Sequence, residues 1–118
     1  MSKLKFPLQA KKIFKAAKDM DIVMEPGYPD RCVIGVVCLA NGIKDTYTYR
    51  EKHAELLGVP VKDLAALECG FEGWNEKHNA LHLRWDSFSV RNNEMPSIMK
   101  NRYYKVGQNL RKMVDNAS

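Results

Sequence analysis

The segment from His53 to Gly70, HAELLGVPVKDLAALECG, constrains the fold more than any other stretch of the chain. Its first half contains helix-forming residues up to Gly58, and Pro60 lies just beyond. Its second half predicts another short helix from Val61 to Cys69, ending at Gly70. Glycine ends helices because it adopts left-handed backbone angles without steric cost, and proline cannot continue a helix. The segment therefore predicts two short helices joined by a tight turn.

Further helices are predicted at the two ends of the chain, and the first helix of this segment is predicted to begin a few residues before it. Residues 7–20 have an apolar stripe at helical spacing, and residues 101–114 have another. The apolar face of the last helix contains Tyr103, Val106, Gly107, Leu110, Met113 and Val114. Thr48 and Glu51 have the spacing of a capping box, which predicts the start of the helix that ends at Gly58.

The run CVIGVVCLANG predicts a buried helix. Asp30 can cap this helix, which extends from Arg31 to about Asn41 and ends at a left-handed Gly42. The β-branched residues of the run also permit a strand. The length of the run and its Asn-Gly ending favour the helix.

Residues 71–95 have the weakest pattern. Leu81, Leu83 and Trp85 alternate with polar residues, and residues 88–90 are the one visible partner strand. The chain has 118 residues, which predicts one globular domain over residues 1–118. We therefore expect a mostly α fold of about five helices, with a small β-hairpin near residues 80–90.

Basic residues are concentrated at the two ends of the chain, which has a net charge of +5. The first eighteen residues contain six lysines and no acid, whereas the last nineteen contain five basic residues and one acid. Such clusters suit a polyanionic partner, although a solvated helix face is the alternative. The candidate nucleic-acid-binding residues are Lys11, Lys12, Lys15, Lys18, Arg102, Lys105 and Lys112.

The cysteines and the hydropathy pattern predict a cytoplasmic protein that does not bind membranes. Cys32, Cys38 and Cys69 form an odd and sparse set, which does not make a disulfide framework and is typical of a reducing compartment. The first two lie in an apolar run, so buried free thiols are expected. No apolar run approaches the ~20 residues of a membrane-spanning helix.

The titratable residues do not form a catalytic pattern. His78 and His82 could share a helix face with Cys69 or Glu72 as a zinc site, but the pattern around Asn79 disfavours a helix, so two solvated histidines are expected. A thiol near a helix C-terminus is a poor nucleophile because the helix dipole disfavours its thiolate. The carboxylates Glu68, Glu72, Glu76 and Asp86 are scattered. We therefore predict no catalytic residue, no metal and no cofactor.

The sequence GFEG contains two glycines around an aromatic-acidic pair and is followed by Trp74. The simplest interpretation is that Phe71 and Trp74 anchor a turn in the core. The alternative is an exposed aromatic turn, which makes Phe71 and Trp74 the candidate protein-binding residues.

Three landmarks, CVIGVVCLANG, LECGFEGW and YYKVGQNLRK, give the chain a resemblance to small proteins of unassigned function encoded by tailed phages and some bacteria. In those proteins a C-x-x-G helix, a central acidic-aromatic turn and a Y-x-x-G-x-x-L-R terminal helix recur. The resemblance covers about a third of the chain. It implies a compact, mostly helical fold and a phage or mobile-element origin, and it implies no activity.

Residues 53–70 also resemble the helix-turn-helix of phage-repressor-type regulators. Ala54 matches the small position of the first helix and Gly58 matches the turn, whereas His53 replaces the usual apolar residue. The matching buried positions are Leu57, Val59, Leu64 and Leu67. The positions expected to be exposed on the second helix are Lys62, Asp63, Ala66 and Glu68. One lysine and two acids suit a DNA groove poorly, so we expect a packing helix rather than a recognition helix.

These observations favour a small non-enzymatic accessory protein of phage or mobile-element origin that binds a host macromolecule, with a host protein as the preferred partner. The alternatives are a nucleic-acid-binding regulator that uses its basic helices or residues 53–70, and a small hydrolase. A basic surface formed by both ends of the chain would favour nucleic acid. An exposed aromatic turn would favour a protein, and Cys69 beside a histidine or a pocket of clustered carboxylates would favour an enzyme.

Overall fold

The computed structural model describes residues 8–25, 32–44, 50–73 and 95–117. These residues form six α-helices and contain no strand, which confirms the prediction of a mostly α fold. The predicted hairpin near residues 80–90 lies outside the described residues. The helices are α1 (Ala10–Asp19), α2 (Val33–Ala40), α3 (Arg50–Leu57), α4 (Val61–Glu72), α5 (Met95–Lys100) and α6 (Arg102–Ala117).

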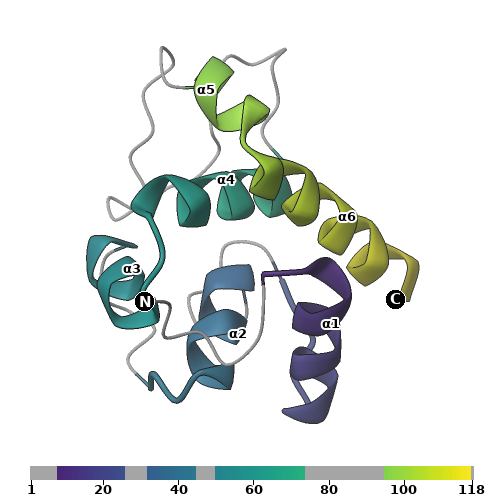
Figure 1. The fold of residues 1–118 in the computed structure, drawn as a ribbon. Helices are drawn as coiled ribbons and strands as arrows, with labels where there is room; N and C mark the ends of the chain where they lie inside the picture. The colour runs from purple at the N-terminus through teal and green to yellow at the C-terminus, as the bar shows by residue number, and fades with distance from the viewer. Residues whose placement is uncertain (1–7, 26–31, 45–49, 74–94, 118) are drawn as a thin grey trace.

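Helix α4 is the centre of the arrangement because it contacts α2, α3, α5 and α6 (Figure 1). Helix α5 lies on one side of α4, and α2 and α3 lie on the other side, whereas α6 crosses α4 and continues beside α1 (Figure 1). Helix α1 contacts both α2 and α6. The first and last helices of the chain are therefore neighbours.

The central position of α4 follows from its composition, since it is apolar on nearly all sides. Leu64, Leu67 and Phe71 are fully buried in the main core, together with side chains of α1, α2, α3 and α6. Ala65, Ala66 and Cys69 are buried in a smaller cluster against α5 and α6. A helix with apolar residues all around its surface is stable only when other elements cover it completely.

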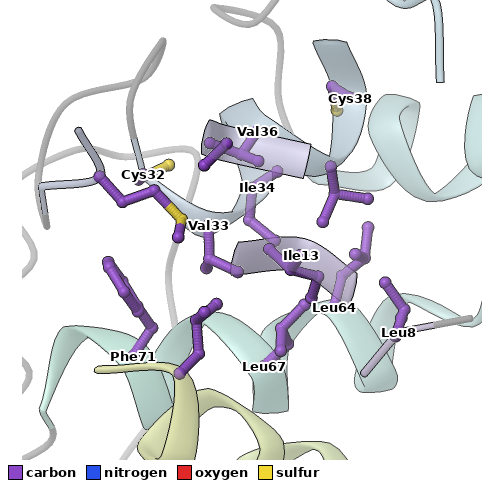
Figure 2. Close-up of a cluster of buried hydrophobic side chains, with 14 of the residues drawn as sticks. Leu8, Ile13, Cys32, Val33, Ile34, Val36, Cys38, Leu64, Leu67 and Phe71 are labelled. Carbon is purple, nitrogen blue, oxygen red and sulfur yellow. The ribbon is translucent and has the colours of Figure 1, made fainter. Parts of the chain in front are cut away.

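Helix α2 supplies the opposite wall of the main core. The buried residues of α2 are Val33, Ile34, Gly35, Val36, Val37 and Cys38. Figure 2 shows Val33 and Ile34 of α2 extending toward the labelled side chains of α4, with Ile13 of α1 drawn between the two helices. The prediction of a buried helix here, rather than a strand, is confirmed.

The start of α2 differs from the predicted one. The helix begins at Val33 instead of Arg31, and Cys32 is its N-cap residue in place of Asp30. The Sγ atom of Cys32 accepts a hydrogen bond from the backbone N–H of Gly35 at 3.5 Å. This thiol is buried, so capping and core packing use the same side chain. At the other end, Gly42 has the predicted left-handed conformation, with φ of 82°.

The predicted end of α4 at Gly70 is wrong. The helix continues to Glu72, and Gly73 is its left-handed C-cap residue with φ of 80°. Gly70 instead lies where α4 crosses α6, because a Cβ atom there would collide with the carbonyl oxygen of Tyr104. A Cβ atom on Gly107 would likewise collide with the carbonyl oxygen of Leu67 and would lie 2.8 Å from the backbone nitrogen of Phe71. Gly70 therefore permits close packing of the α4 and α6 backbones instead of ending α4.

Helix α6 is held at both its start and its middle. It covers Arg102–Ala117, close to the predicted 101–114, and its buried residues Tyr104, Gly107 and Leu110 lie on the predicted apolar face or beside it. The Oδ1 atom of Asn101 accepts a hydrogen bond from the N–H of Tyr103 at 2.9 Å. The Nη1 atom of Arg111 donates to the carbonyl oxygen of Phe71 at 2.9 Å, which satisfies a backbone group in the last turn of α4.

Helix α1 is shorter than predicted, with its first turn at Ala10 rather than Pro7, which lies outside the described residues. Ile13 and Ala17 are its buried residues, in agreement with the predicted stripe. Helix α5 was not predicted. Over the part of the chain that the structure describes, none of the helices combines the length and apolar character needed to span a bilayer.

Candidate functional site

The four candidate lysines of α1 are all exposed. Lys11, Lys12, Lys15 and Lys18 lie away from the buried residues Ile13 and Ala17. Lysine side chains gain hydration on the outer face of an amphipathic helix, and the apolar stripe holds the opposite face on the core. The packing of α1 therefore presents four positive charges to solvent.

The three candidate basic residues of α6 are exposed as well. Arg102, Lys105 and Lys112 lie away from its buried residues Tyr104, Gly107 and Leu110. The structure answers a question that the sequence left open, because α1 and α6 contact each other. The two basic ends of the chain thus lie on neighbouring helices.

Several of these cations are not neutralised within the described parts of the molecule. Lys15 Nζ pairs with Asp19 Oδ2 at 2.9 Å on the exposed surface. By contrast, Lys11 and Lys12 of α1 and Lys105 and Lys112 of α6 form no ion pair with any residue that the structure describes. We refer to the seven exposed candidates Lys11, Lys12, Lys15, Lys18, Arg102, Lys105 and Lys112 as the basic surface.

Two cations of the basic surface lie over aromatic rings. The Nζ atom of Lys18 lies 5.0 Å from the ring centroid of Phe14, and the guanidinium carbon of Arg102 lies 4.9 Å from that of Tyr103. The Nη2 atom of Arg102 also donates a hydrogen bond to the Tyr103 hydroxyl at 3.1 Å. Aromatic rings and cations in this arrangement attract each other and place the charge beside an apolar surface.

A groove opens between α1 and the end of α6. Its volume is about 350 Å³, and we call it the α1–α6 groove. The residues that line it are Phe14, Ala17, Lys18, Ile22, Val23, Met24, Glu25, Val114, Asp115 and Ala117. Sequence reasoning did not identify it, because residues 22–25 follow α1 without any periodic pattern and join the other residues only through packing.

Helices α3 and α4, which contain the helix-turn-helix-like residues 53–70, are consecutive and contact each other. Residues 58–60 connect them, and Gly58 has a left-handed φ of 74°. The predicted buried positions Ala54, Leu57, Leu64 and Leu67 are buried, and Val59 packs partly against them. The unusual residue His53 is also buried.

The exposed positions predicted for α4 are only partly correct. Lys62 is exposed, but Ala66 and Glu68 are buried. Asp63 is half-buried, and its Oδ1 atom accepts a hydrogen bond from Asn101 Nδ2 at 3.0 Å. The error arose because a two-helix pattern does not show what else covers the second helix. Ala66 packs in a cluster with residues of α5 and α6, and Glu68 lies near the thiols of Cys32 and Cys38.

Of the two aromatic candidates for a protein-binding turn, Phe71 and Trp74, only Phe71 lies within the described residues. Phe71 is fully buried in α4, in agreement with the core interpretation, and the guanidinium carbon of Arg111 lies 5.8 Å from its ring centroid. The GFEG segment is the end of a helix rather than a turn. Trp74 lies outside the described residues.

The three thiols are buried, as predicted for Cys32 and Cys38. Burial, and to a smaller extent the Glu68 carboxylate, raises the pKa of both Cys32 and Cys38 to about 12. Such thiols stay protonated at neutral pH, and the protonated form is a poor nucleophile. Cys69 is fully enclosed beneath α5 and α6.

The remaining titratable candidates do not assemble into a site within the described residues. His78, His82, Glu76 and Asp86 lie outside them. Among the described residues, no three His, Cys, Asp or Glu side chains come together in a way that could hold a metal ion.

No family model, curated protein or solved structure matches the chain. The landmarks of the phage-protein resemblance can nevertheless be placed in the fold. Cys32 caps α2 by accepting a hydrogen bond from the N–H of Gly35, Gly70 packs on α6, and Gly107 packs on α4. These landmark residues thus form packing and capping contacts, which explains why the motifs by themselves imply no chemistry.

Proposed function

We propose that the protein binds the phosphate backbone of nucleic acid through the basic surface of α1 and α6, without base-sequence preference. The observation that supports this most directly is the contact between α1 and α6, which places the exposed cations of both chain ends on neighbouring helices. Phosphate neutralisation supplies most of the affinity of sequence-independent binding.

The dimensions of the helices suit this role. Arg102 and Lys112 are ten residues apart on α6, which corresponds to about 15 Å along the helix axis. Successive phosphates of one strand of duplex DNA are about 3.4 Å apart along its axis, so one helix can reach several of them. The unpaired lysines of the basic surface have no described carboxylate to displace before they bind phosphate.

A host protein, the partner favoured by the sequence, has less support, since Phe71 belongs to the core. Recognition of specific DNA sites by α4 also has less support, because Ala66 and Glu68 are buried. An origin in a phage or mobile element, and a partner that belongs to the host, stay part of the proposal on the strength of the resemblance alone.

The test is the affinity for a fluorescently labelled oligonucleotide, measured by anisotropy over a series of salt concentrations. The logarithm of the binding constant should fall linearly with the logarithm of the salt concentration. The triple change Lys11→Gln, Lys12→Gln and Lys18→Gln should weaken binding about tenfold or more and reduce the salt slope by about 2 to 3. Lys15 is left in place because Asp19 already neutralises it.

The matched control removes the same charge from another part of the surface, with Lys44→Gln, Lys52→Gln and Lys62→Gln. These three side chains are exposed and do not lie on α1 or α6, and of the three only Lys52 has a described ion-pair partner, Glu55, at the longer distance of 3.8 Å. The control variant should retain most of the affinity. Equal losses in the two triple variants would show that only net charge matters, and would contradict a binding surface on α1 and α6.

A further inference from the structure

The α1–α6 groove lies beside the basic surface and shares a residue with it. Lys18 lines the groove and also belongs to the exposed lysines of α1. Most of the other lining residues are apolar, including Ala17, Ile22 and Val114. A site for phosphate alone needs no such apolar cavity, so the groove suits a ligand that has an apolar part next to its charge.

Two residues of α1 that line this groove, Phe14 and Lys18, lie on the same side of the helix as Lys11. The three residues are separated by three and four positions, which is the spacing of neighbours on one helix face. Phe14 is partly exposed and lines the groove, and the Lys18 ammonium lies over its ring. An aromatic ring between two cations matches a nucleotide chain, in which a flat base alternates with a phosphate.

We infer that the α1–α6 groove takes an unstacked base of single-stranded nucleic acid while Lys11 and Lys18 contact the flanking phosphates. This inference rests on the proposed function and specifies its substrate class. Bases of a duplex are stacked inside the helix and expose only their edges, so they cannot enter an apolar groove. The protein should therefore prefer single strands to duplexes.

The acidic residues at the groove are compatible with this arrangement. The Oδ1 atom of Asp115 accepts a hydrogen bond from Arg111 Nε at 3.1 Å, so its charge is partly compensated. Glu25 lies on the segment after α1 and has its own interaction. Carboxylates repel phosphate but accept hydrogen bonds from base amino groups. The backbone therefore follows the lysines of α1, and the base occupies the groove.

The experiment compares a labelled single-stranded 12-mer with its duplex at equal salt, using anisotropy. The single strand should bind about fivefold or more tightly, which corresponds to one base–aromatic contact. Ala117→Leu fills part of the groove at an exposed lining residue without changing the charge, and Asn116→Leu adds the same side chain at its exposed neighbour, which does not line the groove. Ala117→Leu should remove the single-strand preference, whereas Asn116→Leu should leave the affinity for both ligands nearly unchanged.

A second pair of measurements tests the base site with a variant whose folding can be checked separately. Phe14→Leu retains an apolar side chain but cannot stack on a base, so it should reduce single-strand affinity about fivefold and leave duplex affinity unchanged. A 2-aminopurine base in the strand should change its fluorescence on binding to the original protein and not to this variant. Circular dichroism establishes that each variant is folded.

The outcomes separate this inference from the proposed function. Equal affinity for single strand and duplex, with both ligands sensitive to the lysine changes, would overturn the base site and leave the phosphate-binding function intact. An apolar dye in the groove that is displaced by an apolar peptide and not by the oligonucleotide would also overturn it. Absence of binding to either nucleic acid at low salt would contradict both proposals.

Discussion

The pair α3–α4 and the pair α1–α6 differ in which of their residues reach solvent. The sequence of helices α3 and α4 resembles a DNA-binding motif, yet Ala66 and Glu68 of α4 are buried. Helices α1 and α6 match no binding motif in the sequence, yet they contact each other and expose seven basic candidates. A helix-packing motif specifies how two backbones meet, whereas binding depends on the side chains that the rest of the fold leaves exposed.

The difference also has an energetic side. In α4, apolar burial and close backbone contact stabilise the fold, so substitutions there should lower the free energy of unfolding. In α1 and α6, exposed charges contribute little to stability, so substitutions there should change binding instead. The predictions below use this contrast, from the largest expected effect to the smallest.

The largest effect is expected for Leu67→Ala. Leu67 is fully buried in the main core, so its truncation should lower the free energy of unfolding by about 2 to 5 kcal/mol, measured by urea denaturation. The matched surface change in the same helix, Lys62→Ala, should cost less than about 0.5 kcal/mol. Similar small losses in both variants would contradict the central position of α4.

The crossing of α4 and α6 is tested by Gly107→Ala. The new methyl group would collide with the carbonyl oxygen of Leu67, so the helices must separate, at an expected cost of about 2 to 3 kcal/mol. Gly73→Ala is the control, since no atom lies within 4 Å of its Cβ position. Only the strain of a left-handed alanine remains there, at about 1 to 2 kcal/mol.

Alkylation of Cys69 measures whether α5 and α6 cover this face of α4. The thiol is fully buried beneath α5 and α6, so it should resist iodoacetamide in the native protein and react faster in the Gly107→Ala variant. After denaturation without a reductant, all three cysteines should react, as expected for free thiols. Rapid alkylation of Cys69 in the native protein would show that this face of α4 is open.

A smaller effect is expected at the start of α4, where Asp63 accepts the hydrogen bond from Asn101. Asp63→Ala should lower the free energy of unfolding by about 1 kcal/mol, because Asn101 also caps α6. This replaces the expectation that Asp63 is a silent surface residue. Asn101→Ala should cost at least as much, and the double variant should show that the two losses are not additive.

The smallest effect is expected for Lys62→Ala on nucleic-acid binding. Lys62 is exposed but lies on α4, away from the basic surface, so affinity should change less than twofold, within the range of a weak surface charge effect. Competition between related DNA sites should show no change in discrimination. Relaxed discrimination of ~1 to 3 kcal/mol would instead identify α4 as a recognition helix and reverse the comparison.

The sequence by itself determined the helical class, the positions of α1, α2, α4 and α6 to within a few residues, and the buried leucines of α3 and α4. These features follow from local causes, namely the spacing of apolar residues and the conformational preferences of glycine and proline. Gly42 and Gly58 end segments through their own backbone angles, so they could be assigned from the chain alone.

Only the tertiary structure decided which surfaces remain free. Gly70 looks like a helix end in the sequence. In the structure its missing Cβ atom leaves room for the carbonyl oxygen of Tyr104, a residue more than thirty positions away. Ala66 looks exposed in the sequence but is buried in a cluster with residues of α5 and α6, and the lysines of α1 and α6 lie on neighbouring helices only because α1 packs on α6. Each of these features depends on contacts between residues far apart in the chain, and no local pattern of side chains specifies which distant helix will supply the contact.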